Sequence, residues 1–234
     1  LPPLAALAPA HVRDLDAYQP GKPIEELERE LGITGALKVA SNENPLGPSP
    51  KALAAVAGAL GTVHLYPDAA GHALRQALAA HLDVSPDALA LGAGSNDLLY
   101  QLVLALVGPD EEMLTPALGF LSYRLAAAVA GRRFVSTAAT PLGADVDALI
   151  AGITPRTKLC VIGTPNNPTG AVWTMPEVER VLAALPPTAL LVIDEAYYDY
   201  AAAWPEDYAS GDRKRTVDGL AGLREGAAQF RAEM

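Results

Sequence analysis

From about residue 73 onward, short apolar runs alternate with longer stretches whose apolar residues recur every three or four positions. This alternation is typical of strand and helix in turn, and it favours a parallel α/β sheet. Two runs of strand length rich in Val, Ile and Leu, 158–163 and 189–193, are predicted as buried strands. Residues 133–137 are a weaker strand candidate, and 88–92 is predicted as the end of a strand.

Helices are predicted where leucine and valine recur at helical spacing. The stripes are Leu74, Leu78, Leu82; Leu98, Leu102, Leu106; Leu121, Leu125, Val129; and Val178, Val181, Leu185. The last of these helices should begin with a capping box, because Thr174 stands three residues before Glu177. Residues 212–234 carry a similar stripe, so a helix is predicted there in spite of three interrupting glycines.

The charge balance limits the partners that the chain can have. Lys and Arg number 17 against 27 Asp and Glu, for a formal net charge of -10, and no block of basic residues interrupts that balance. Nucleic acid and anionic membrane surfaces are therefore poor partners. No apolar stretch approaches the roughly 20 residues of a membrane helix. The single cysteine, Cys160, lies in an apolar run, which favours a buried thiol over a nucleophile and fits a reducing cytoplasm.

Two loops that follow the predicted strands carry candidate chemistry. Thr-Pro-Asn-Asn-Pro-Thr-Gly occupies 164–170, at the carboxyl end of a strand, where open parallel sheets bind ligands. The same residue types also make ordinary turns. The next predicted strand is followed by Asp-Glu-Ala-Tyr at 194–197. Three roles are open for the aspartate: a helix cap, a salt-bridge partner, or a buried charge. A buried charge would need a cation or hydrogen-bond donors. Together the loops predict a slot for a ring with a protonated nitrogen.

These two motifs resemble those of the fold-type I aminotransferases, which use pyridoxal 5'-phosphate (PLP). The segment Ser-Asn-Glu-Asn-Pro-Leu-Gly-Pro-Ser-Pro at 41–50 is similar to the entrance loop of the histidinol-phosphate aminotransferases, and implies that Asn44 contacts substrate. Tyr-Pro-Asp at 66–68 also matches that family, and the likeness runs in order from about Asp16 to Tyr200.

The resemblance implies transamination between an amino compound, with L-histidinol phosphate as the leading candidate, and a 2-oxo acid, 2-oxoglutarate. Threonine-phosphate decarboxylases and aromatic aminotransferases share most of these motifs and stay open as alternatives. A non-catalytic PLP-fold fragment or binding domain is the alternative from another class. The implied location is cytoplasmic and the implied assembly is a homodimer.

The domain plan is also implied by the resemblance. Residues 1–40 would form an N-terminal arm, and 41–211 an incomplete PLP-binding large domain with a mainly parallel sheet sandwiched by helices. Residues 212–234 would form a helix that leads into a small carboxy-terminal domain, which is mostly absent from the sequence.

Roles around the cofactor ring follow from matching positions. Asp194 would pair with the ring nitrogen and keep it protonated, while Asn167 and Tyr197 would hydrogen-bond the ring oxygen. Phe120 falls where the family places an aromatic ring stacked on the cofactor. Tyr123 competes for that role, and for either residue an ordinary core aromatic is the alternative.

The phosphate and the substrate have their own candidates. Gly94, Ser95 and Asn96 begin a predicted helix, so their amides and the helix dipole suit a phosphate, although an ordinary N-cap fits too. Tyr66 resembles a tyrosine that crosses a dimer interface to the neighbouring cofactor phosphate, and a surface tyrosine before a turn is the alternative. Tyr18 resembles a contact to the substrate phosphate. No metal site is predicted, because the histidines lack carboxylate company and a shared helical face.

The chain departs from the family pattern at the lysine that joins the cofactor covalently. The family carries it on a Ser-x-x-Lys or Ser-Lys turn after a strand, well beyond the Asp-Glu-Ala-Tyr motif. The lysines of this sequence are Lys22, Lys38, Lys51, Lys158 and Lys214. None of them has that context. As printed, the chain is therefore expected to be inactive or incomplete.

Two alignments of the tail stay open. In one, 220–224 is the family's Leu-Ala-Gly-Leu-Arg, and three residues with the lysine have been lost between Thr216 and Val217. In the other, 215–234 is part of the helix to the small domain, and several tens of residues are absent after about Gly211. We favour the second, because the helical stripe is continuous. Three explanations for the missing lysine are an omitted segment, a fragment of a longer protein and a dead paralogue. We favour the omitted segment, because the other site residues are intact.

Overall fold

The computed structural model describes residues 7–13, 15, 21–39, 41–44, 46–140 and 143–201. The described residues fall into two units, one within Leu1–Leu15 and His72–Met234 and the other within Asp16–Gly71. Tyr18, the helix predicted over 212–234 and both alignments of the tail lie outside the described residues.

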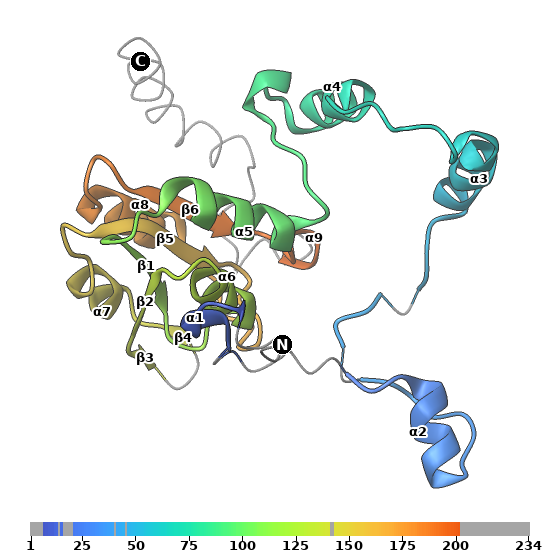
Figure 1. Ribbon diagram of the computed structural model, residues 1–234, viewed down its shortest axis with the longest axis horizontal. Helices are drawn as coiled ribbons and strands as arrows, with labels where there is room; N and C mark the ends of the chain where they lie inside the picture. The colour runs from blue at the N-terminus through green and yellow to red at the C-terminus, as the bar shows by residue number, and fades with distance from the viewer. Residues whose placement is uncertain are drawn as a thin grey trace. The chain divides into compact units, whose positions relative to one another are not determined.

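A parallel sheet forms the centre of the larger unit (Figure 1). Its strands are β1 (Glu112–Pro116), β2 (Arg133–Thr137), β5 (Thr157–Gly163) and β6 (Leu190–Asp194). Their order in the sheet is β2-β1-β5-β6, and every neighbouring pair is parallel. The strands predicted at 133–137, 158–163 and 189–193 are confirmed, each to within one residue at either end.

Helices cover both faces of this sheet, because alternate strand residues point to opposite sides. On one face, α5 (Ser95–Leu106) and α6 (Leu121–Val129) pack on Met113, Leu159 and Val161. The other face packs Leu114, Cys160 and Ile162 against α7 (Val146–Ala151) and α8 (Met175–Ala184). The predicted α/β sandwich is confirmed, and so is the stripe assigned to α8.

The helices α5 and α6 are present, but their predicted stripes are wrong: Leu106, Leu121 and Val129 are exposed, and the buried faces carry Leu99 and Val103 in α5 and Tyr123, Ala126 and Ala127 in α6. Leucine spacing predicted the helices, and the packing on the sheet decided which face each helix buries.

Local signals in the sequence account for two features of this unit. The capping box of α8 is present, with the Thr174 amide donating to Glu177 Oε2 at 2.8 Å. Cys160 is a buried strand thiol, as predicted, and burial raises its pKa to about 12. A thiol held protonated in this way is a poor nucleophile.

Strand β1 has no counterpart among the predicted strands, because its five residues, Glu-Met-Leu-Thr-Pro, start with a charge and end with a proline. Glu112 is nevertheless fully buried. Its Oε1 accepts hydrogen bonds from the hydroxyls of Thr154 at 2.5 Å and Thr157 at 3.2 Å. Its Oε2 lies 3.0 Å from Nε of Arg133. These partners, all distant in sequence, let a charged residue start a central strand.

The strand end predicted at 88–92 is wrong. Pro86–Ala88 is a 3-10 turn (η3), and Leu89 is extended with φ -109° and ψ 132°. Residues 89–92 pair with no strand in the part of the chain that the structure describes. Extended backbone becomes a strand only when a neighbour supplies ladder hydrogen bonds, and apolar composition alone does not supply one.

The remaining elements belong partly to the larger unit and partly to the smaller one. The larger unit also contains α1 (Ala10–Arg13), α4 (His72–Leu82), α9 (Tyr198–Ala201) and an antiparallel pair, β3 (Ala139–Thr140) with β4 (Gly143–Ala144). α4 confirms the helix predicted from Leu74, Leu78 and Leu82. The smaller unit contains α2 (Ile24–Leu31), α3 (Pro50–Ala59) and a 3-10 turn, η2 (Leu60–Thr62). No helix in the described ranges is long and apolar enough to cross a membrane.

Candidate functional site

The two motif loops leave the sheet at one place, the carboxyl ends of β5 and β6. Gly163 and Asp194 are register partners in the parallel ladder. The Thr164 amide continues the ladder by donating to the Asp194 carbonyl at 3.0 Å. The sheet thus sets the loop at 164–170 beside the loop at 194–197, as expected for a ligand site of an open parallel sheet.

Asn167 and Tyr197, one from each loop, are in direct contact. Asn167 Nδ2 donates a hydrogen bond to the Tyr197 hydroxyl at 3.2 Å. The preceding residue, Asn166, shapes the loop, since its Nδ2 donates to the Leu118 carbonyl at 3.0 Å and to Thr169 Oγ1 at 2.8 Å. The structure therefore brings together two of the predicted ring contacts.

The Asp194 carboxylate is partly buried and has one protein donor on each oxygen. Oδ2 accepts from the Tyr123 hydroxyl at 2.9 Å, and Oδ1 accepts from the Ala196 amide at 3.1 Å. Among the described residues, no Lys, Arg or His forms an ion pair with this carboxylate. A carboxylate with neutral donors and no cation keeps its charge free to attract a cationic ligand.

Tyr123 is a core residue, the alternative that was predicted for it. Its side chain is 1% exposed, and Phe120 meets its ring edge-on with centroids 6.0 Å apart and an interplanar angle of 84°. Burial raises the Tyr123 pKa far above its ordinary value, and the negative charge of Asp194 raises it further. Tyr123 is therefore a neutral hydrogen-bond donor to Asp194.

Sequence reasoning did not find the link between Tyr123 and Asp194. The two residues are 71 positions apart, and nothing in their local patterns connects them. The only available signal was the placement of Tyr123 three residues after Phe120, on the same side of a predicted helix.

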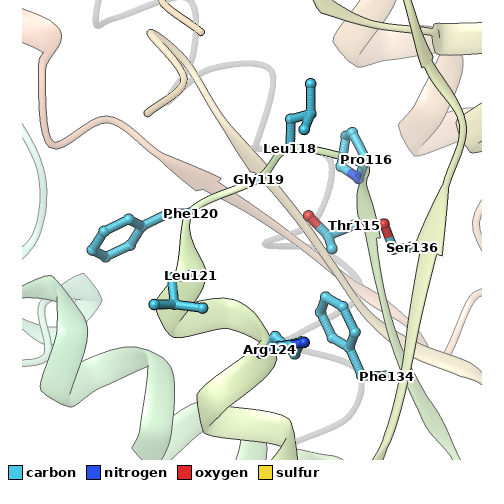
Figure 2. A pocket seen from close by; sticks show the side chains of 9 residues that line it. All are labelled: Thr115, Pro116, Leu118, Gly119, Phe120, Leu121, Arg124, Phe134 and Ser136. Atoms are coloured by element: carbon cyan, nitrogen blue, oxygen red, sulfur yellow. The ribbon is translucent and has the colours of Figure 1, made fainter. Parts of the chain in front are cut away.

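Phe120 lies at the start of α6 and is partly buried. It lines a cavity of about 220 Å³ between the ends of β1 and β2 and the first turn of α6 (Figure 2). Thr115, Arg124 and Ser136 supply its polar lining, and Thr115 Oγ1 is buried without a hydrogen-bond partner in the described part of the chain. Asp194, Asn167 and Tyr197 do not line this cavity, so Phe120 is the only residue that it shares with the predicted ring contacts.

Residues 94–96 lie at the beginning of α5, at the carboxyl end of the sheet. α5 ends at Leu106 and leads through a short connection to the start of β1, so its own start lies toward the opposite end of the strands. The first turn of an α-helix leaves its amides without intrahelical acceptors. Gly94 has φ 85°, a left-handed conformation that favours glycine.

Asp97 fixes the loop in front of α5. Its Oδ2 accepts hydrogen bonds from the Ala93 amide and from Gln101 Nε2, both at 2.9 Å. The bond from the Ala93 amide, followed by the bond from Gln101, holds the pKa of Asp97 below its ordinary value. These bonds orient the Asp97 carboxylate toward the loop before α5 and fix the position of that loop relative to the first turn of the helix.

The other predicted site residues lie in the smaller unit. Tyr66 is fully exposed in the single chain. Asn44 closes a turn, because its Oδ1 accepts from the Leu46 amide at 3.0 Å and its Nδ2 donates to the Gly47 carbonyl at 3.3 Å. The dimer and substrate contacts assigned to Tyr66 and Asn44 stay predictions.

Lys158 is the one lysine that the structure describes in the larger unit, and it is at the wrong end of the sheet. It stands second in β5, with Nζ 3.8 Å from Glu111 Oε1. Gly163 is five positions further along the strand, or roughly 16 Å away at 3.3 Å per residue. Lys158 is therefore not the lysine that would join a cofactor beside Asp194, in agreement with the sequence analysis.

Comparisons with known proteins identify the family of the chain. The family described as "Aminotransferase class I and II" matches residues 34–227. The chain is 44% identical over 231 residues to histidinol-phosphate aminotransferase 1 of Nitrosococcus oceani, covering 94% of this chain and 62% of that protein. It is 45% identical over 243 residues to histidinol-phosphate aminotransferase of Anaeromyxobacter sp., covering 97% and 66%. The chain thus spans less than two thirds of these curated relatives.

Solved structures agree with the fold. The structure of histidinol-phosphate aminotransferase from Sinorhizobium meliloti in complex with pyridoxal-5'-phosphate has a TM-score of 0.72 and 33% identity, covering 85% of this chain and 52% of that one. N-succinyldiaminopimelate aminotransferase from Mycobacterium tuberculosis has a TM-score of 0.60 and 32% identity, covering 74% and 48%. Proteins with different named substrates therefore share this fold at similar identity.

Proposed function

The chain belongs to the aminotransferase class I and II family, and on this premise we propose that it is the PLP-binding part of a histidinol-phosphate aminotransferase. The reaction would move an amino group between L-histidinol phosphate and 2-oxoglutarate. The names of the two curated relatives described above support this substrate over the decarboxylase and aromatic alternatives. The observation that carries the proposal is the Asp194 carboxylate, which has no protein cation among the described residues and adjoins the hydrogen-bonded Asn167 and Tyr197.

The residues present fit the chemistry of PLP. The cofactor has a ring nitrogen that is cationic when protonated, an anionic ring oxygen and a phosphate. A carboxylate oxygen has two lone pairs, so each oxygen of Asp194 can accept a further donor beside Tyr123 or Ala196. When bound, PLP supplies an electron sink for breaking a bond at the substrate carbon next to its nitrogen.

Each side chain would then have a separate task. Asp194 holds the proton on the ring nitrogen, and without that proton the ring withdraws electrons poorly. Asn167 Nδ2 and the Tyr197 hydroxyl, already 3.2 Å apart, orient the ring by donating to its oxygen. Phe120 covers one face of the ring and excludes water from it.

The phosphate would be bound by the start of α5. The amides of Gly94, Ser95 and Asn96 and the positive end of the dipole of this 12-residue helix attract an anion. Because α5 starts at the carboxyl end of the sheet, this assignment is compatible with Asp194 at the end of β6. The side chain of Ser95 adds a hydroxyl donor at the first helical position.

We further propose that the protein is a cytoplasmic homodimer in which Tyr66 reaches the phosphate of the neighbouring subunit, while Tyr18 and Asn44 contact substrate. The exposure of Tyr66 in the single chain is compatible with a role at an interface. A fully exposed tyrosine loses apolar contact with water when a partner covers it, which favours association.

Cofactor binding is the first test. PLP is titrated into the chain and followed by its visible absorbance, with pyridoxal, which lacks the phosphate, as the matched control. We expect saturable binding of PLP and weaker binding of pyridoxal, because the start of α5 has no anion to bind. A chain that is folded and binds neither compound contradicts the proposal.

Covalent attachment is the second test. Borohydride fixes PLP to a lysine only where the two are already joined. We expect PLP to bind this chain reversibly and Lys158 to stay unmodified, as judged by peptide mass mapping. Fixation of PLP on Lys158 would contradict the assigned ring position, since Lys158 is at the other end of β5. Reversible binding with no turnover would favour the non-catalytic alternative for the chain as printed.

Substrate choice is the third test. L-histidinol phosphate with 2-oxoglutarate is compared with L-threonine phosphate in the PLP-loaded protein. Glutamate formation with the first substrate supports the proposal. Release of carbon dioxide from the second supports the decarboxylase instead.

A further inference from the structure

We propose that Tyr123 is a positioning residue that fixes the orientation of the Asp194 carboxylate toward the cofactor ring. This inference rests on the proposed function, in which Asp194 faces the ring nitrogen. Tyr123 itself would touch neither the ring nor the substrate, because its side chain lies in the core between α6 and the sheet.

The geometry supplies two fixed points on the carboxylate. Tyr123 reaches from α6 past the end of β5 and donates to Asp194 Oδ2 at 2.9 Å. The Ala196 amide donates to Oδ1 at 3.1 Å. A carboxylate held on both oxygens cannot rotate freely about its Cβ–Cγ bond, so the remaining lone pairs point in a constant direction. A ring nitrogen would then find its acceptor already in place.

Gly163 leaves the space that this hydrogen bond needs. It is the register partner of Asp194, and a Cβ at this position would lie 3.1 Å from the Tyr123 hydroxyl and 3.2 Å from Asn166 Oδ1. A methyl group this close would push the hydroxyl by a few tenths of an ångström. Any side chain larger than glycine would therefore disturb both the donor to Asp194 and the loop that carries Asn167.

The chemical type of the donor matters as much as its position. A lysine or arginine in place of Tyr123 would form an ion pair with Asp194 and remove its attraction for a cationic ring. A buried tyrosine is neutral, and burial keeps it protonated by raising its pKa. Tyr123 thus orients the Asp194 carboxylate without neutralising its charge. The negative charge therefore stays available to the cationic ring nitrogen of the cofactor.

The test replaces Tyr123 by Phe, which removes the hydroxyl and keeps the ring in the core. PLP labelled with ¹⁵N in the ring is bound to the chain, and the ¹⁵N chemical shift is followed against pH. We expect the Tyr123→Phe variant to lose the ring-nitrogen proton at lower pH than the wild type. Its PLP dissociation constant should rise about 5- to 10-fold, the usual effect of losing one hydrogen bond.

Tyr100→Phe is the matched control, because Tyr100 packs against the same apolar cluster from α5. It should leave both the ¹⁵N titration and the dissociation constant unchanged. Gly163→Ala is the second variant, which keeps the hydroxyl and displaces it. It should shift the ¹⁵N titration in the same direction as Tyr123→Phe, so the inference can be tested even if Tyr123→Phe fails to fold.

A readout without cofactor separates the two proposals. The infrared carboxylate band of Asp194, assigned by its loss in Asp194→Asn, should shift in Tyr123→Phe and stay in place in Tyr100→Phe. An unchanged band, or an unchanged ¹⁵N titration, overturns the positioning role while PLP binding by the wild type leaves the proposed function intact. If the band shifts in Tyr123→Phe and the wild-type chain binds no PLP, the proposed function alone is overturned.

Discussion

Each end of the sheet carries a carboxylate, Glu112 at one end and Asp194 at the other, and the two carboxylates have different kinds of partner. Glu112 begins β1 with a side chain that is 1% exposed, and two arginines, Arg133 and Arg156, lie 3.0 and 3.7 Å from its Oε2. Asp194 ends β6 partly exposed, with the Tyr123 hydroxyl and the Ala196 amide as its protein donors. One charge has its cations within the fold, and the other has none among the described residues.

This difference separates a structural acid from a candidate functional acid. A buried carboxylate needs donors and opposite charge, and Glu112 has two hydroxyl donors on Oε1 and two arginines near Oε2. Asp194 has donors that hold its orientation, and no residue in the described ranges supplies it with a positive charge. Burial and strand position also differ between the two acids, but it is the nature of the partners that leaves the charge of Asp194 available to a ligand.

The largest effect is expected at Glu112. Glu112→Ala removes the acceptor of the Thr154 and Thr157 hydroxyls and the partner of Arg133, so the free energy of unfolding should fall by about 3 kcal/mol. Urea denaturation followed by circular dichroism measures the loss. Arg133→Ala, a change at a largely exposed side chain, should cost less than about 1 kcal/mol. An equal loss in both variants would contradict the central role of the buried carboxylate.

Asp194→Asn should lower the affinity for PLP strongly and the free energy of unfolding only slightly. The ring nitrogen loses its charged acceptor, so the affinity for PLP should fall about 10- to 100-fold, which is typical of a lost hydrogen bond to a charged group. Stability should change by only about 1 kcal/mol, since the amide oxygen still accepts from Tyr123 and only the bond from the Ala196 amide, at a partly exposed site, is lost. Asp87→Asn, at a side chain that is 91% exposed, is the control for loss of a negative charge. A stability loss in Asp194→Asn as large as in Glu112→Ala would remove the distinction between the two acids.

Stability at high pH tests whether Tyr123, the donor to Asp194, stays neutral in the folded chain. The folded pKa of Tyr123 is raised by burial, so above about pH 10, the ordinary tyrosine pKa, the unfolded chain releases its proton first. Stability contributed by Tyr123 is therefore full below about pH 10 and is lost as pH rises above it. Near pH 11 the wild type should lose about 1 kcal/mol more than Tyr123→Phe. Urea midpoints of the two proteins at several pH values check this, and parallel curves would show that Tyr123 ionises in the folded state.

Asp97 gives the smallest effect, because it lies at the surface. Its pKa is held down by the Ala93 amide and then by Gln101, so the charged form is favoured in the folded chain. That stabilisation is present above about pH 4 and is lost as pH falls through the lowered pKa. Carbon NMR of the Asp97 carboxyl measures the titration. Gln101→Ala should move the pKa part of the way back, and no movement would assign the whole effect to the amide of Ala93.

Local patterns in the sequence determined the elements and the sequence motifs. Val and Ile runs predicted β5 and β6, and the capping box at Thr174 predicted the start of α8, because these signals act between residues close in the chain. The loops indicated a ring-binding slot, and the resemblance to the aminotransferases selected Asn167 and Tyr197 within them. Their contact followed from the parallel pairing of β5 with β6.

Two segments whose structure depends on residues distant in the sequence could not be predicted from local patterns. Strand β1 was missed because Glu112 looks wrong for a central strand until Thr154, Thr157 and Arg133 surround it. Residues 88–92 have the composition of a strand, but no neighbour among the described residues pairs with them. In both segments, partners that lie far away in the sequence decided the outcome.

The sequence by itself determined the type of fold, the loops that carry the chemistry and the absence of a lysine in the expected context. Only the tertiary structure decided which acid has a cationic partner within the part of the chain that the structure describes. The physical reason is that the cost of a buried charge depends on every dipole and charge within a few ångströms. For Glu112 and Asp194 most of those groups come from segments 21 to 71 residues away.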